Sequence, residues 1–414
     1  MRLNLAIALG LVFGLLFGLT AAITESPLLL TIATAVEPIG DAFVNLFKMV
    51  VIPLVTSVIF VGVGRLGDLR KLGRMGGVTL GFFGVTTAIA VLIGMGVTKA
   101  MLPLASESVK DAVTVASAEA PELPTTVEFL LSLIPSNPFA AAAEGALLPL
   151  ILFTLMLGAA TGTLAGPDRE RLLSLAESVA AALIKLVHWI MLTAPVGVFA
   201  LAAPVTARAG VAMLQSLAIF VVACLVGEVV FISLVYLPVV RFVAKMPIRT
   251  FLKGCVTPQI IAATTVSSPA TVPAMLEAAD KAFHTSPTVA GFVVSLGAGL
   301  GRAGAALFQG SCIVFLAWLF DIPLPMALVW AALLATIIVS FTVPSIPGGS
   351  ILSLAPAMVT VGIPFDGVAV LFGIDRIPDA ARTATNVTGT LAATVVIDRM
   401  EKEHTVSATP TSDN

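Results

Sequence analysis

The sequence predicts an all-α polytopic membrane protein with about eight transmembrane helices and two shorter helical hairpins that enter the bilayer and return to the same side. Of its 414 residues, 58% are hydrophobic and only 11% are charged, and the mean hydropathy is +1.07. A water-facing globular surface does not tolerate this composition. Apolar stretches of about twenty residues, the length that crosses ~30 Å of hydrocarbon as a helix, recur from residue 3 to residue 393.

The charge and cysteine content exclude several classes of function. The formal net charge of −2 leaves no basic stripe for phosphates, so nucleic acid is not an expected partner. Cys224, Cys255 and Cys312 lie in or beside apolar segments and do not have metal-ligand spacing. No nucleophile has a base at recognisable spacing. The chain is therefore expected to be neither an enzyme nor a holder of a cofactor, and its surroundings are the lipid bilayer.

The short loops carry Lys and Arg unevenly, which orients the spans. Basic residues follow the second span at 65–74 and the sixth at 241–253, whereas the loop at 104–128 holds five acidic residues and one lysine. The positive-inside rule places the two basic loops in the cytoplasm and the acidic loop outside. The first span, residues 3–23, lacks a small-residue cleavage site and is expected to be retained. We therefore expect a multi-pass protein of the cell membrane with both termini in the cytoplasm.

Residues 1–240 consist mainly of long spans that contain isolated ionisable residues. Such residues are typical of side chains that reach toward the membrane interface. They are Lys48, Glu144, Lys185, His188 and Glu228. Glu228 differs from the rest because apolar residues flank it on both sides, so we expect it to face a neighbouring helix or subunit.

From about residue 249 the apolar segments become short and are interrupted by Ser, Thr, Gly and Pro. Residues 251–279 form two short runs joined at 264–269, and residues 328–363 repeat this plan around 344–350. Each pair precedes a span, which gives a hairpin and a helix twice in opposite orientation. Paired interrupted segments indicate the midplane binding site of an inverted-repeat transporter. Backbone leaves the helix at that depth only where protein, water or substrate satisfies it, and helix N-termini at the tips suit a carboxylate.

The final predicted span, residues 365–397, carries a polar stripe. Five polar residues follow one another at spacings of 4, 3, 4 and 4, namely Asp375, Asp379, Arg382, Asn386 and Thr390. These spacings place them on one face of a helix, and ionisable groups at this depth indicate a functional site. The fork of Arg382 suits a carboxylate and Asp379 suits an ammonium group, which together describe an acidic amino acid. The alternative is a structural salt bridge between Asp379 and Arg382.

The seventh span is predicted to break at residues 296–304, where several glycines allow the backbone to unwind. Arg302 lies inside this break and must meet a carboxylate, carbonyl groups or the substrate. Asp375 and Asp379 are its available partners. A structural counter-charge for Asp375 and direct participation in binding both remain open.

At these residues the chain resembles the glutamate/aspartate transporter family, the dicarboxylate/amino acid:cation symporters. The resemblance covers nearly the whole chain and is carried by residues 47–54, 137–139, 194–200, 373–375, 382–383 and 386–389. It implies a homotrimer that works by an elevator mechanism. Residues 1–240 would be mainly scaffold and trimerisation region, with part of the third span joining the transport domain. Residues 249–397 would form the core of the transport domain, and residues 398–414 a cytoplasmic tail.

The function implied by the resemblance is secondary active symport of an acidic amino acid such as aspartate or glutamate. Arg382 would bind the side-chain carboxylate, Asp379 the amino group, and Asn386 with Ser268 the α-carboxylate. Ser267, Ile346, Ser350 and Thr383 would complete the pocket, and Arg302 and Asp375 would compensate or couple charge. A C4-dicarboxylate transporter in which Asp379 pairs with Arg302, and an anion-conducting channel lined by Arg302 and Arg382, are the alternatives.

The chain departs from the family pattern where members hold sodium. Members carry Asn-Met-Asp-Gly-Thr where this chain has Gly-Arg-Ala-Gly-Ala at 301–305, and Thr390 replaces an aspartate of the last span. Loss of these oxygen ligands is expected to abolish or weaken at least two sodium sites. The positions that the resemblance leaves for residual sodium are Thr86, Thr87, Gly297, Ser340 and Asn386.

Arg302 appears where the sodium motif is lost. We expect it to supply permanently the positive charge that a bound sodium ion would bring. Proton coupling through Asp375, Asp379 or Glu228, or uncoupled exchange, is then expected in place of sodium coupling.

Overall fold

The computed structural model describes residues 2–66, 69–113, 131, 134–144, 146–340, 349–364, 371–372 and 374–408. Every regular element within these ranges is a helix, so the all-α prediction is confirmed. Six helical stretches in the described ranges are long and apolar enough to cross a membrane. They are Leu5–Thr24, Pro27–Gly64, Arg74–Leu104, Gly166–Ala209, Val211–Phe242 and Pro287–Leu319.

The two other predicted spans differ from this pattern. The fourth corresponds to α8 (Leu147–Gly162), whose 16 residues are too few to cross ~30 Å of hydrocarbon at 1.5 Å per residue. The last corresponds to α20 (Arg376–Ala408), which is long enough at 33 residues but carries many polar side chains. Most of α20 is buried in protein, so it does not need an apolar surface for contact with lipid.

The helix that carries the last predicted span begins at Arg376 and extends beyond the predicted end at residue 397. Residues 365–370 and 373, at the predicted start of the span, lie outside the described part of the chain. The helix continues to Ala408 through much of the predicted tail. Ion pairs at its far end hold this extension: Arg74 lies 2.9 Å from Glu401, and Lys245 lies 2.9 Å from Glu403.

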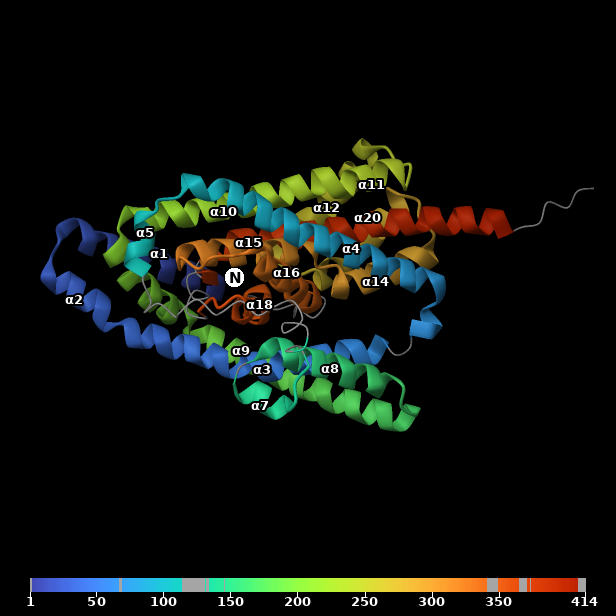
Figure 1. Cartoon of the computed structure of the whole chain (residues 1–414). Helices are drawn as coiled ribbons and strands as arrows, with labels where there is room; N and C mark the ends of the chain where they lie inside the picture. Colours follow the sequence, from blue (N-terminus) through green and yellow to red (C-terminus); the bar gives the residue numbers. More distant parts are fainter. Residues whose placement is uncertain are drawn as a thin grey trace, which may run out of the picture.

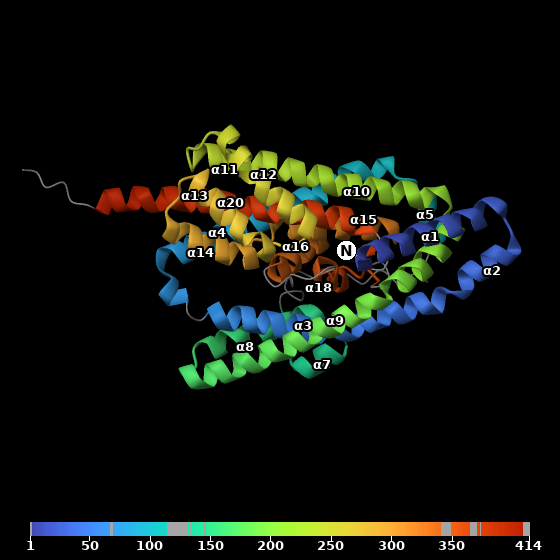
Figure 2. The same cartoon turned by 180° about the vertical axis from the view of Figure 1, so that it is seen from behind.

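Helices from the first part of the chain form one packed group. This group comprises α1 (Arg2–Thr24), α2 (Pro27–Ala35), α3 (Glu37–Leu66), α7 (Pro138–Ala143), α8 and α9 (Gly166–Ala209). Both α1 and α3 pack along α9, and α3, α8 and α9 lie together on one side of the molecule in Figures 1 and 2. A Cβ atom at Gly14 would lie 2.9 Å from the carbonyl oxygen of Phe199, and one at Gly18 2.5 Å from that of Ala203. Small residues at four-residue intervals thus bring the α1 and α9 backbones together, as in helix pairs that associate in lipid.

A second group combines α4 with helices from the later part of the chain. It comprises α4 (Leu69–Met101), α10 (Val211–Phe231), α11 (Leu237–Phe242), α12 (Ile248–Thr265), α13 (Val272–Lys281), α14 (Pro287–Leu300), α15 (Ala303–Leu319) and α20. Gly94 packs directly against the carbonyl oxygen of Leu307, and a Cβ atom at Gly310 would lie 2.5 Å from the carbonyl oxygen of Val91. The third predicted span therefore packs closely with helices of the second half.

The first predicted hairpin is present as a helix pair. α12 has 18 residues and α13 has 10, and they pack against each other on either side of a turn at residues 266–271. In the second pair, α16 (Met326–Ser340) packs against α18 (Ala355–Thr360) after the single turn α17 (Gly349–Leu352). Figure 1 shows α16 and α18 between the two groups of helices. Of the predicted second tip at 344–350, residues 344–348 lie outside the described residues, whereas Gly349 and Ser350 begin α17.

The predicted break of the seventh span is also present, and it is narrower than predicted. α14 continues through Gly297 and Gly299 to Leu300, and α15 starts at Ala303. Only Gly301 and Arg302 leave the helical conformation, with φ and ψ of −74° and 77° at Gly301 and −114° and 23° at Arg302. The break therefore leaves a helix C-terminus and a helix N-terminus facing one another beside α20.

Candidate functional site

The charged residues at the start of α20 form one buried cluster. Nη1 of Arg382 donates to Oδ1 of Asp375 at 2.5 Å, and Nη2 donates to Oδ2 of Asp375 at 3.1 Å. Nη2 also lies 2.8 Å from Oδ1 of Asp379. The guanidinium carbon stands 4.4 Å from the ring centre of Phe308. The Arg382 side chain is only 3% exposed, so these contacts form away from water, where charge-assisted hydrogen bonds are strong.

Local backbone geometry explains how one arginine reaches two aspartates. Asp375 does not lie within the helix, as its predicted place in the stripe required; it directly precedes the helix, and its carbonyl oxygen accepts the Asp379 N–H at 2.7 Å. Carboxylates at this end of a helix are stabilised by the positive end of the helix dipole. Asp379 lies in the first turn, and Arg382 lies three residues further on.

The pairing bears on the alternatives left open by the sequence. The salt bridge between Asp379 and Arg382 that was considered as a structural alternative is formed. It is not an isolated pair, because Asp375 binds the same guanidinium. Asp375 is therefore engaged by Arg382, and Asp379 is the carboxylate that Arg302 influences electrostatically.

Arg302 occupies the break between α14 and α15. Its side chain is buried, and its Nε donates to the carbonyl oxygen of Gly299 at 3.1 Å. This carbonyl belongs to the last turn of α14, where backbone acceptors have no partner within the helix and a cation is favoured by the dipole. The break thus provides both a site for the cation and an acceptor for it.

Asn386 closes the other side of the break. Its side-chain oxygen accepts the N–H of Gly304 at 2.9 Å and that of Ala305 at 3.4 Å. These are donors of the first turn of α15, so Asn386 caps that helix from α20. One turn earlier, the Thr383 hydroxyl donates to the carbonyl oxygen of Asp379 at 2.7 Å.

The tip of the first hairpin is strained and carries a buried hydroxyl. Val266 adopts the left-handed conformation, with φ 52° and ψ 42°, which costs a β-branched residue about 1–3 kcal/mol. The Ser268 side chain is buried, and among the described residues its Oγ has no hydrogen-bond partner. Oγ of Ser267 accepts the N–H of Ala270 at 3.3 Å. No described hydrogen bond joins either serine to Arg382, and the link from α12 to α20 is made by Gln259, which donates to the Thr388 hydroxyl at 2.8 Å.

Gln309 in α15 connects two positions predicted to belong to the site, and sequence reasoning missed it. Its Nε2 donates to the carbonyl oxygen of Ser350 at 3.0 Å, and its Oε1 accepts from the Ser340 hydroxyl at 3.0 Å. All three side chains are buried. The available signal was a lone amide in an otherwise apolar run one residue after Phe308. Ile346, the remaining predicted pocket residue, lies outside the described residues.

The positions considered for residual sodium offer hydroxyl, amide and backbone oxygens and no carboxylate. Thr86 and Thr87 are buried on α4, and the Thr86 hydroxyl donates to the carbonyl oxygen of Phe82 at 2.8 Å. A Cβ atom at Gly297 would lie 2.5 Å from Cγ2 of Thr390, so this threonine side chain fills the space beside the glycine. The described residues contain no group of three or more His, Cys, Asp or Glu side chains suited to a metal ion. The donor set thus lacks the carboxylates that a hard cation prefers.

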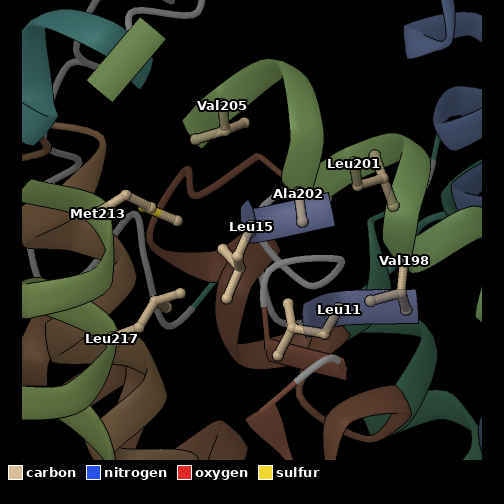
Figure 3. A pocket seen from close by; sticks show the side chains of 8 residues that line it. All are labelled: Leu11, Leu15, Val198, Leu201, Ala202, Val205, Met213 and Leu217. Atoms are coloured by element: carbon tan, nitrogen blue, oxygen red, sulfur yellow. The ribbon is translucent and has the colours of Figure 1, made fainter. Parts of the chain in front are cut away.

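A cavity elsewhere in the molecule has a different character. It has a volume of about 10 Å³, room for roughly one water molecule, and is lined by apolar side chains of α1, α9 and α10. Figure 3 shows the lining residues Leu11, Leu15, Val198, Leu201, Ala202, Val205, Met213 and Leu217. None of the buried charged residues lines it, so it is a packing gap and not part of the candidate site.

Comparison with known proteins agrees with this architecture. The sequence profile of the sodium:dicarboxylate symporter family matches residues 3–400. The chain is 32% identical over 378 residues to a proton/glutamate-aspartate symporter of Escherichia coli strain K12, covering 89% of this chain and 86% of the relative. It is 32% identical over 379 residues to a proton/sodium-glutamate symport protein of Geobacillus stearothermophilus, covering 90% and 89%. It is 30% identical over 375 residues to a C4-dicarboxylate transport protein of Laribacter hongkongensis, covering 89% and 84%. The chain is thus a multi-pass membrane transporter and not an enzyme, and it belongs to the sodium:dicarboxylate symporter family.

Proposed function

We propose that this chain is a symporter that carries an acidic amino acid, such as aspartate or glutamate, together with a cation other than sodium. The observation that carries the proposal is the buried guanidinium of Arg382, which binds two carboxylates beside an interrupted helix. The names of two similar relatives include glutamate as the transported solute. A group built to hold carboxylates at bilayer depth suits a solute that brings a carboxylate of its own.

Binding would exchange one ion pair for two. A substrate carboxylate replaces Asp379 at Nη2 of Arg382, and the freed Asp379 accepts the substrate's ammonium group. Asp375 keeps its two hydrogen bonds and holds the guanidinium in orientation. This exchange leaves neither Arg382 nor Asp379 without an opposite charge, which matters because breaking a buried pair without replacement costs about 3–5 kcal/mol.

The remaining pocket follows from the groups around this cluster. The hydroxyl of Ser268, which has no hydrogen-bond partner among the described residues, is a donor suited to the substrate's α-carboxylate. Asn386 caps the start of α15, and we place the substrate's α-carboxylate beside it. Ser267, Ser350 and Thr383 border the pocket, and Ile346 belongs to the same set.

Coupling to a cation other than sodium is supported by the residues at the positions where the family pattern places sodium ligands. Thr390 fills the space beside Gly297, and the candidate donors lack a carboxylate. Arg302 stands close enough to Asp379 to act as a fixed positive charge. The name of one similar relative gives the proton as coupling ion, and the name of another gives the proton and sodium. We therefore expect proton coupling, with sodium coupling weak or absent.

The proposal extends to assembly and movement. Residues 249–397, joined by α4, form the moving transport domain of an elevator, and most of residues 1–240 form a trimeric scaffold. The two helix pairs are re-entrant hairpins of inverted repeats, both chain ends face the cytoplasm, and residues 398–414 emerge there. The close packing of α4 against α15 supports this division.

A C4-dicarboxylate is the second candidate substrate. It is favoured by the electrostatic contact between Arg302 and Asp379, which offers Asp379 a cation without a substrate ammonium group. A similar relative is named for this transport. Competition of labelled aspartate by succinate separates the two candidates.

Calorimetric titration of the purified protein tests the proposal. Aspartate, glutamate and succinate are each titrated with and without sodium at two pH values. We expect saturable binding of aspartate that is the same with and without sodium. A steep gain of affinity with sodium would overturn the coupling assignment, binding of succinate alone would favour the second candidate, and no binding of any of the three would overturn the function.

A further inference from the structure

Glu228 is a buried carboxylate that the substrate site does not use. It lies in α10 and its side chain is 5% exposed. Its Oε2 is buried and has no hydrogen-bond partner among the described residues, while the carboxyl group hydrogen bonds with Thr385 of α20. Because α10 packs against α4, α15 and α20, this carboxylate lies inside the second group of helices. It therefore faces protein and not lipid.

A count of buried charges singles out Glu228. Two guanidinium groups, Arg302 and Arg382, lie among two carboxylates, Asp375 and Asp379, and the four charges cancel. Asp398, which is also buried, has its own partner in Lys402 at 2.6 Å and accepts the Ser286 N–H at 2.8 Å.

Glu228 remains as a carboxylate without a cation of its own. A buried charge without compensation is costly, and a bound proton removes that cost.

The surroundings of Glu228 place it within electrostatic reach of the substrate site. From α20 it faces Arg382 and Thr385. From its own helix it faces Cys224, which contacts Ser311 of α15. From the π-helical segment at Ile232–Tyr236 it faces Tyr236, which hydrogen bonds with Thr86 of α4. Arg382 is the only cation among these neighbours in the described part of the chain.

We propose that Glu228 is the site that carries the proton accompanying the substrate, and that Arg382 links the two binding events. This inference rests on the proposed function and names its coupling residue. On the outer side the carboxylate accepts one proton to become a carboxylic acid, and on the inner side it releases that proton again. No other bond is made or broken.

The coupling follows from charge. While the site is empty, the positive charge of Arg382 favours the ionised form of Glu228. An acidic amino acid adds one net negative charge to the cluster around Arg382, so the protonated form of Glu228 becomes more favourable when substrate is bound. By reciprocity a proton on Glu228 strengthens substrate binding by the same factor. Proton and substrate therefore bind together, as symport requires.

The test compares three forms of the full-length protein: wild type, Glu228→Gln and Cys224→Ser. Gln mimics the protonated carboxyl group, and Cys224 lies one turn earlier as a buried residue of the same helix. Aspartate affinity is measured between about pH 5.5 and 9, where its side chain stays ionised, together with proton uptake on binding. Fumarate is the probe in the same protocol if aspartate does not bind.

For wild type and Cys224→Ser we expect affinity to fall with rising pH, by up to about tenfold per pH unit for one coupled proton. Glu228→Gln should bind with an affinity that does not change with pH and without proton uptake. In vesicles it should exchange internal for external aspartate and fail to accumulate it under a proton gradient.

The inference would be overturned if Glu228→Gln kept the pH-dependent affinity and the proton uptake of the wild type. Wild-type affinity that does not vary with pH would also overturn it, although the proposed function would then stand. Binding of neither aspartate nor fumarate by wild type would instead overturn the proposed function. If Glu228→Gln does not fold, the inference is tested with Glu228→Asp and with infrared difference spectra of the wild type. Absence of a protonated-carboxyl signal when substrate is added to the wild type would contradict the inference.

Discussion

Replacing Arg382 with lysine separates its role in binding a ligand from its role in neutralising two aspartates. Lysine keeps the positive charge, so Asp375 and Asp379 are not left without a cation. It loses the planar fork, whose two terminal nitrogens both donate to Asp375 while Nη2 also lies 2.8 Å from Asp379. The variant should therefore fold but bind substrate less well.

The magnitude follows from the contacts. A lysine ammonium placed between the two aspartates cannot also reproduce the hydrogen bond from Nη2 to a substrate carboxylate. Loss of one charge-assisted hydrogen bond costs about 1.5–3 kcal/mol, which raises the Kd roughly 10- to 150-fold. Removal of the guanidinium from the face of Phe308, 4.4 Å away, acts in the same direction.

The assay is equilibrium binding of labelled aspartate to purified protein. Arg399→Lys is the matched control, because Arg399 lies on the same helix and pairs with Glu403 at 2.9 Å on the exposed end. Its Kd should equal that of the wild type. Unchanged affinity and selectivity in Arg382→Lys would show that the cluster only neutralises charge, and the identification of the substrate site would be wrong.

Three further outcomes concern packing and tethering. Gly304→Ala should lower Tm, because its Cβ atom would lie 2.5 Å from the Arg382 carbonyl oxygen and overpacking costs about 1–3 kcal/mol; Gly291→Ala, where that atom meets open space, should not. Gln309→Leu should speed amide hydrogen exchange in residues 349–364, because its amide holds one end of that segment; unchanged exchange would contradict the assignment. Lys245→Gln should speed exchange at the end of α20 at neutral pH. Because the hydrogen bond from Lys245 lowers the pKa of Glu403, the wild-type contact is lost only as the pH falls through that lowered pKa, so acidification should reproduce the variant's effect.

The sequence predicted those parts of the fold that depend on periodicity and backbone chemistry. The spacing of Asp379, Arg382 and Asn386 placed them on one helix face, and α20 carries them there. The glycines near Arg302 predicted a helix break, and the two short runs around residues 264–269 predicted a helix pair. These features follow from local sequence, which is why they could be predicted without tertiary contacts.

Features that depend on tertiary contacts could not be predicted in the same way. Periodicity placed Asp375 within the helix, whereas α20 begins one residue later and Asp375 pairs with Arg382 from outside the helix. Gln309 was missed because its role appears only when Ser340 and Ser350 approach from a segment distant in sequence. The helical continuation to Ala408 makes ion pairs with residues far along the chain, which the polar composition of residues 398–408 could not reveal.

The close glycine contacts within each helix group determine where the chain can pivot. The backbones of α1 and α9 are in close contact, as are those of α4 and α15. Each pair therefore resists sliding of one helix along the other. Any displacement of one group relative to the other must then change backbone torsions in the segments that connect the groups. Gly210, which connects α9 to α10, has φ 58° and ψ −139°, a conformation open mainly to glycine. A bulkier residue at position 210 would restrict the backbone torsions that connect α9 to α10.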